Sequence, residues 1–134
     1  TSASDTVTVS TNNAAGYDLT LANSDATLTL VNGANTIGAH AGTYAAPTAL
    51  ANNTWGYAVG GLGSFDASYT TLTNATTSTT KWSGVPSSAS PQNIKSTATV
   101  ASGDTTTVWY AVKADTTKPN GVYTDTVTYT ATTK

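Results

Sequence analysis

Hydrophobic and polar residues alternate along most of the chain. In Asp5–Ser10, Val7 and Val9 fall on one face of an extended chain, and Thr6 and Thr8 fall on the other. Alternation with a period of two predicts half-buried antiparallel strands, and no stretch shows a convincing helical period. The segments with this pattern are Asp5–Ser10, Tyr17–Leu21, Ala26–Val31, Trp55–Val59, Ile94–Val100, Thr105–Val112 and Tyr123–Ala131.

Turn-forming residues separate these segments, because Asn, Gly and Pro stand where turns prefer them. The turns are Asn13–Gly16, Asn32–Gly33, Ser102–Asp104 and Lys118–Gly121. About seven short strands at this spacing predict an all-β fold: a single antiparallel β-sandwich with immunoglobulin-like, Greek-key topology. Residues 32–53 and 60–80 do not alternate, and we predict two long loops there. No boundary divides residues 1–134, which we expect to form one domain.

The composition explains how a chain so poor in aliphatic residues can fold. Leu, Ile, Val and Phe together make up only 20 of 134 residues, a fraction close to that of disordered chains. The net charge is only −2, however, and 31 residues are Thr. Thr is β-branched and suits a pleated surface that faces water. The Thr excess therefore predicts the polar outer faces of sheets.

The residue inventory argues against several classes of function. With five Lys, no Arg and an acidic balance, the chain lacks the basic surface of a nucleic-acid-binding protein. No apolar run is long enough to span a membrane. Without Cys there is no thiolate metal site, and we expect neither a metal nor a cofactor. The single histidine, His40, lies among Ala and Gly with no patterned Ser or Asp partner. We interpret it as an exposed loop residue and predict no catalytic residues and no enzyme activity.

The aromatic residues support an alternative function. Trp109 and Tyr110 are neighbours on one predicted strand, so they must point to opposite faces and only one can face the main core. Exposed aromatic side chains on a β-sandwich can stack on sugars. A carbohydrate-binding module that uses Trp55, Trp82, Trp109 and Tyr110 is therefore the alternative to a structural role. The competing interpretation is that these side chains fill the core, where each buries about 150–250 Å².

Two sequons offer candidate modification sites. Asn52-Asn-Thr54 and Asn74-Ala-Thr76 match the acceptor pattern for N-glycosylation. Asn52 and Asn74 would carry glycans only in a host that glycosylates.

The N-terminal segment carries the leading hypothesis about assembly. Residues 1–11 read as one clean strand followed by a long turn. A first strand that pairs with a neighbouring subunit gains main-chain hydrogen bonds for affinity, and Val7 and Val9 fill pockets that set the register. The simpler alternative is that the strand pairs within its own sandwich. The start Thr1-Ser-Ala-Ser4 fits a mature end left by cleavage at small residues.

Four motifs resemble a known group of proteins. They are Asn53–Tyr57, Trp82–Pro86, Thr107–Asp115 and Pro119–Thr130. Through them the chain resembles Thr-rich secreted β-sandwich surface domains of Gram-positive and candidate-phylum, Saccharibacteria-like bacteria, from about Ser4 onward. The last motif is also similar to the final strand of pilin-like spore-coat-U proteins, whose Cys pair is absent here. The resemblance implies an extracellular surface setting and supplies no catalytic residues.

Together these observations predict an extracellular structural or adhesive protein of a cell surface. The expected partners are further copies of the chain, in a homo-oligomer or a pilus-like filament built by N-terminal strand donation. A surface glycan or a host-cell surface is the further expected partner of an adhesive form.

Overall fold

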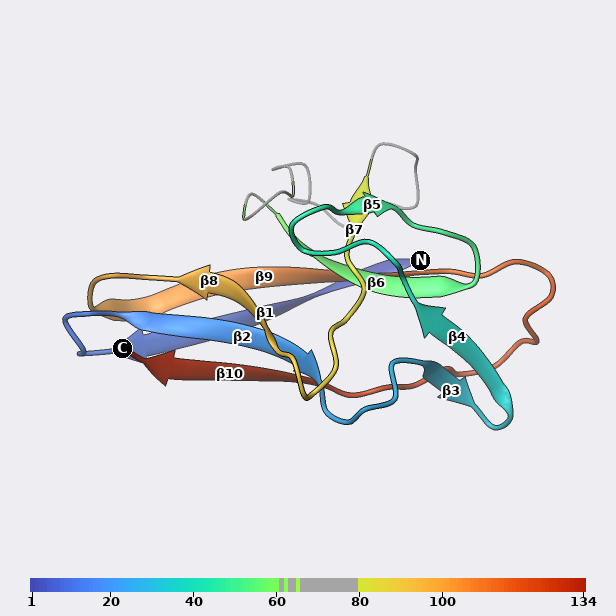
Figure 1. Cartoon of the computed structure of the whole chain (residues 1–134), viewed down its shortest axis with the longest axis horizontal. Helices are drawn as coiled ribbons and strands as arrows, with labels where there is room; N and C mark the ends of the chain where they lie inside the picture. Colours follow the sequence, from blue (N-terminus) through green and yellow to red (C-terminus); the bar gives the residue numbers. More distant parts are fainter. Residues whose placement is uncertain (61, 63–64, 66–79) are drawn as a thin grey trace.

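The computed structural model describes residues 1–60, 62, 65 and 80–134. These residues form strands, turns and irregular segments with no helix, so the prediction of an all-β fold is confirmed (Figure 1). The strands are β1 (Ser2–Thr11), β2 (Tyr17–Asn23), β3 (Leu30–Asn32), β4 (Asn35–Ala39), β5 (Thr48–Ala49), β6 (Thr54–Val59), β7 (Lys81–Trp82), β8 (Gln92–Ser96), β9 (Ala101–Lys113) and β10 (Val127–Thr133).

The strands form three sheets. Five strands pair in the order β1-β9-β6-β4-β3, three in the order β10-β2-β8, and β5 pairs with β7. All neighbouring strands are antiparallel except β4 and β6, where Gly38 lies opposite Thr54 in a parallel pair. The prediction of purely antiparallel pairing is wrong at this pair. The chain between β4 and β6 contains β5, and it is long enough for the crossover that a parallel pair requires.

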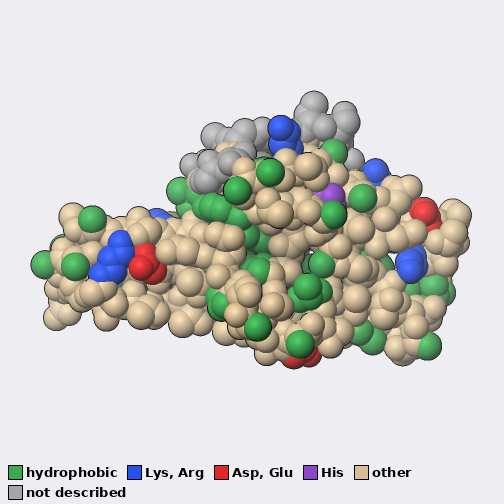
Figure 2. Space-filling view, viewed as in Figure 1, with side chains coloured by type: hydrophobic (Ala, Val, Ile, Leu, Met, Phe, Trp, Pro, Cys, Tyr) green, Lys and Arg blue, Asp and Glu red, His purple; other side chains and the backbone are tan. Residues whose placement is uncertain are grey.

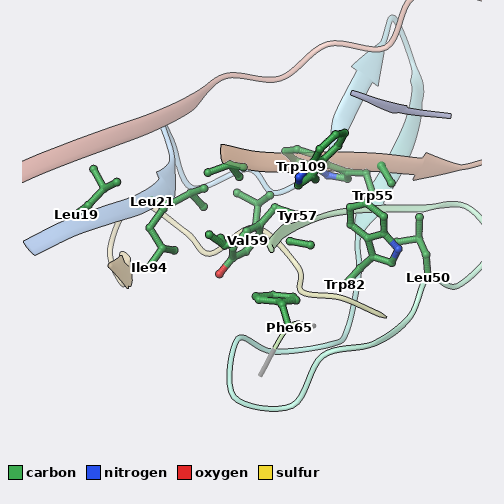
Figure 3. Close-up of a cluster of buried hydrophobic side chains, with 14 of the residues drawn as sticks. Leu19, Leu21, Leu50, Trp55, Tyr57, Val59, Phe65, Trp82, Ile94 and Trp109 are labelled. Atoms are coloured by element: carbon green, nitrogen blue, oxygen red, sulfur yellow. The ribbon is translucent and has the colours of Figure 1, made fainter. Parts of the chain in front are cut away.

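One hydrophobic core is shared by the five-stranded and three-stranded sheets (Figure 3). Leu19 and Leu21 of β2 and Ile94 of β8 belong to the same buried cluster as Tyr57 of β6 and Val108 of β9. Buried residues alternate with less buried ones from Tyr17 to Leu21 of β2, as the period-two pattern predicts. The strand β1 adds no fully buried residue to this cluster.

Two predicted strands are shorter than expected. Only Leu30 and Val31 of the predicted segment Ala26–Val31 lie in a strand, β3. The amide of Asn23 donates to the carbonyl of Thr27 at 2.9 Å, and the Thr27 N–H donates to an Asp25 carboxylate oxygen at 2.6 Å. These side-chain bonds favour a turn over an extended chain.

The strand β8 also ends earlier than the predicted segment Ile94–Val100. The strand stops at Ser96, and Ala98–Thr99 bend toward β9 before Val100, which is exposed.

The two predicted loops have different outcomes. Residues 32–53 contain β4 and β5, so the prediction of a loop there is wrong. These strands are short, and Ile37 is the one residue of either strand that is fully buried, which leaves too little alternation to recognise. The second predicted loop, residues 60–80, lies mostly outside the described residues.

Candidate functional site

The N-terminal strand β1 forms one edge of the five-stranded sheet. It pairs antiparallel with β9 from Ser2 to Thr11, with a bulge between Val9 and Thr11. Val7 lies opposite Thr106, and both Val7 and Val9 are half-buried against the core of their own chain. The two candidate interface valines therefore pack against the core of their own chain, and within this single chain β9 provides the partner strand.

One side of β1 is open, and the hydrogen bonds show which backbone groups face it. Thr1 and Val112 exchange two bonds, N–H of each to the carbonyl of the other, at 3.2 and 3.0 Å. Along an antiparallel pair, residues that bond to the partner strand alternate with residues whose N–H and C=O point away from it. Counting from the bonded pair of Thr1 and Val112, the N–H groups of Thr6 and Thr8 point away from β9. The Thr6 N–H donates to the carboxylate of Asp5 at 2.9 Å. Asp5 thus occupies one outward donor and places a charge on this edge.

The last strand, β10, forms an edge of the three-stranded sheet. It pairs with β2 from Val127 opposite Asn23 to Thr133 opposite Tyr17. Tyr129 is half-buried, and its hydroxyl lies 2.6 Å from that of Tyr110 on β9. Burial raises the pKa of Tyr129 to about 12 and also raises that of Tyr110. This hydroxyl pair links the two larger sheets close to both edge strands.

The three tryptophans named in the carbohydrate hypothesis are buried, so their rings are not open to stack on a sugar. Trp82 is 0% exposed, Trp55 5% and Trp109 6%. A sugar needs the open face of a ring, and these side chains instead fill the core, as the competing interpretation predicted.

Tyr110 is the fourth candidate aromatic, and it lies over Trp55. Their rings are stacked, with centroids 6.5 Å apart and planes 28° apart. Both line a groove of about 220 Å³, together with Leu30, Val112 and the first residues of β1. The exposed surface of this lining is almost wholly apolar.

His40 is buried, so its interpretation as an exposed loop residue is wrong. Its side chain is packed under β5, with Nε2 2.8 Å from the Thr48 hydroxyl and Nδ1 accepting the Ala51 N–H at 3.5 Å. Burial lowers the pKa of His40. Gly84 allows this packing, because a Cβ there would collide with the His40 carbonyl. These contacts hold the loop against the sheet, and among the described residues the two hydrogen bonds to the ring come from a hydroxyl and a backbone N–H, not from a carboxylate.

An ion pair joins the sheets at the opposite end of the core. Lys95 Nζ on β8 lies 2.7 Å from Asp104 Oδ1 on β9, and the Tyr17 hydroxyl donates to Asp104 Oδ2 at 2.7 Å. The hydrogen bond from Lys95 lowers the pKa of Asp104, and burial raises the pKa of Tyr17 to about 12. A carboxylate held between an ammonium and a phenol is suited to tying strands together.

The two sequon asparagines are the remaining candidate site residues. Asn52 is exposed in the turn before β6, accessible for glycosylation, whereas Asn74 lies outside the described residues. The part of the chain that the structure describes contains no group of three or more His, Cys, Asp or Glu side chains that could hold a metal ion. Within the same residues, no helix has the length and apolar character needed to cross a membrane.

No protein-family model, no curated protein and no solved structure matches this chain.

Proposed function

We propose that the protein is an extracellular structural protein of a cell surface and that its copies assemble into a filament by exchanging the N-terminal strand. The observation that carries this proposal is the attachment of β1. It pairs with β9 along nearly its full ten-residue length but adds only half-buried side chains, Val7 and Val9, to the core. The β1 strand of a neighbouring copy offers the same backbone groups and the same two valines.

The turn between β1 and β2 is the segment that must open for exchange. The carbonyl of Asn13 accepts the N–H of Gly16 at 3.0 Å, and Gly16 has a positive φ of 82°. The Asn13 amide also donates to the carbonyl of Lys134 at 2.6 Å. Exchange breaks these few bonds and restores all contacts between β1 and β9 in the neighbouring copy. The net free-energy change is therefore small, as is typical of swapped elements.

The chemistry of the surface supports an extracellular setting. The chain has 12 charged residues among 134, and few of their side chains lie on the face shown in Figure 2. The absence of Cys and Met leaves no sulfur to oxidise. A structural role is better supported than adhesion through these aromatic side chains, because the three tryptophans are buried.

Electron microscopy of the purified protein tests the proposal. We expect filaments from the full chain and none after residues 1–11 are deleted. The shortened protein should bind a synthetic Ser2–Thr11 peptide, and a matched peptide with Val7→Asp and Val9→Asp should bind far more weakly. A shortened protein that stays monomeric with unchanged stability and ignores the peptide would contradict strand exchange.

A further inference from the structure

The four edges of the two larger sheets differ in how they are protected. Edge strands expose unpaired backbone groups that recruit other strands unless charges, prolines or short length prevent it. The edge strand β3 has three residues and is bridged to Thr124, β8 carries Lys95, and β1 carries Asp5. By contrast β10, Val127–Thr133, contains no charged residue, no Pro and no Gly. Such uncharged, β-prone segments of about seven residues are the ones that pair most readily.

The outward backbone groups of β10 can be identified from its bonds to β2. The carbonyl of Thr126 accepts the Ser24 N–H at 2.9 Å, and the Lys134 N–H donates to the Gly16 carbonyl at 3.2 Å. Even-numbered residues of β10 therefore bond to β2, and the N–H and C=O of odd-numbered residues point outward. Among the described residues, no strand pairs with this outward side. In Figure 1 β10 borders its sheet, with β2 on one side only.

The side chains of β10 also show that its sheet ends early. Leu19 and Leu21 of β2 are 1% and 0% exposed, but Ala131, which lies opposite Leu19, is exposed. Tyr129, opposite Leu21, is only half-buried. Burial on the inner face thus falls off beyond β2, and a further strand beside β10 would place new side chains against the open flank of Tyr129 and Ala131.

We propose that β10 pairs antiparallel with β10 of a second copy, joining the two three-stranded sheets into one sheet of the order β8-β2-β10-β10-β2-β8. The absence of charge favours this partner. The paired segment Val127–Thr133 contains no charged residue, so two-fold antiparallel pairing places no like charges opposite each other, while Lys134 Nζ stays bound to Ser96 and Asp18 of its own chain. Pairing β1 with a second β1 would instead place a charged Asp5 from each copy within the paired strands.

The register follows from the alternation of faces. The outward N–H and C=O groups belong to odd-numbered residues in both copies, so odd-numbered residues must pair with odd-numbered residues. This register also keeps the inner faces of the two sheets on the same side. Placing Tyr129 opposite Ala131 of the second copy, and Val127 opposite Thr133, uses the whole strand and makes the contact two-fold symmetric. This contact is separate from the proposed exchange of β1, which involves the other sheet.

Sedimentation velocity over a range of protein concentrations tests the pairing. Ala131→Pro removes an outward N–H without removing a bond to β2. We expect it to weaken self-association through β10 at least tenfold. Thr8→Pro is the matched control, because Thr8 has an outward N–H on β1, and it should leave this association within about twofold of the unaltered chain. Equal association of the unaltered chain and Ala131→Pro, or a chain that stays monomeric at every concentration, would overturn the proposal.

Amide hydrogen exchange on the unaltered chain provides a readout that needs no substitution. Pairing predicts that exchange at Tyr129 and Ala131 slows as protein concentration rises, while exchange at Thr8 does not change. Exchange of the β10 amides that is independent of concentration would overturn the proposal, even if Ala131→Pro failed to fold. Because the readout is local to β10, filament formation through β1 does not produce the same result.

Discussion

The first and last strands carry nearly the same motif and use it differently. Asp5–Thr8 and Asp125–Thr128 both read Asp-Thr-Val-Thr, and in each the Asp carboxylate accepts the next N–H, at 2.9 and 2.8 Å. In β1 that N–H points away from β9 at the open edge of the sheet, so the Asp5 carboxylate takes up a donor that another strand could otherwise bind. Before β10, Asp125 also accepts a bond from the amide of buried Asn23 at 2.7 Å. The same four residues therefore protect the edge at β1 and fix the start of β10 to β2. The difference arises because the position of a strand in its sheet decides which backbone groups lack a partner strand.

The two strands also differ in how firmly they are held. On β10, Tyr129 combines apolar contact with a hydroxyl bond to Tyr110. On β1, Val7 and Val9 offer smaller, purely apolar contacts. This contrast is the reason for proposing β1 as the strand that is exchanged and β10 as the strand that pairs in place.

The largest expected difference is in the free energy of unfolding after truncation of one side chain on each strand. Tyr129→Ala should cost about 2 to 3 kcal/mol, because it removes a half-buried ring and leaves the Tyr110 hydroxyl without its partner. Val7→Ala should cost about 1 kcal/mol. Urea unfolding of both variants measures the difference, and equal costs would show that β1 is anchored as firmly as β10.

Alkaline pH should weaken the attachment of β10. Burial raises the pKa of Tyr129 to about 12, compared with about 10 in an unfolded chain. The folded state therefore holds this proton more tightly, and the stability it contributes is complete below pH ~10 and lost between pH ~10 and ~12. In Tyr129→Phe the alkaline loss should shrink by about 1 kcal/mol, because partial exposure reduces the full effect of the shift. Val7→Ala should keep the full loss in melting curves from pH 8 to 12.

The smallest expected effect on stability comes from Asp5. The change Asp5→Asn keeps an oxygen that can accept the Thr6 N–H but removes the charge from the edge of β1. Unfolding free energy should change by less than about 0.5 kcal/mol, while self-association through β1 should increase. Light scattering against concentration measures the second effect. Unchanged association would mean that Asp5 does not protect this edge.

The alternating pattern predicted the longer strands well, because their buried faces repeat every second residue. It also placed Trp109 and Tyr110 on opposite faces, yet both are largely covered, and sequence alone could not show what covers each face. The pattern missed β4, where only Ile37 is buried. It also missed the burial of His40, which depends on contacts with β5 that are distant from the local Ala- and Gly-rich segment. Whether an edge is free depends on sheet order, which the alternation does not encode.

The exchange of β1 is tested most directly by cysteines placed across its pair with β9. Thr6 lies opposite Thr107 at a position without backbone bonds, where the Cα atoms come close enough for a disulfide, and the chain has no other Cys. Equal amounts of the single variants Thr6→Cys and Thr107→Cys are mixed, allowed to assemble and oxidised, with Thr105→Cys replacing Thr107→Cys as the out-of-register control. Exchange predicts abundant mixed disulfides from the first mixture and few from the control. Mixed disulfides no more abundant than in the control, together with ready closure within the double variant, would contradict it.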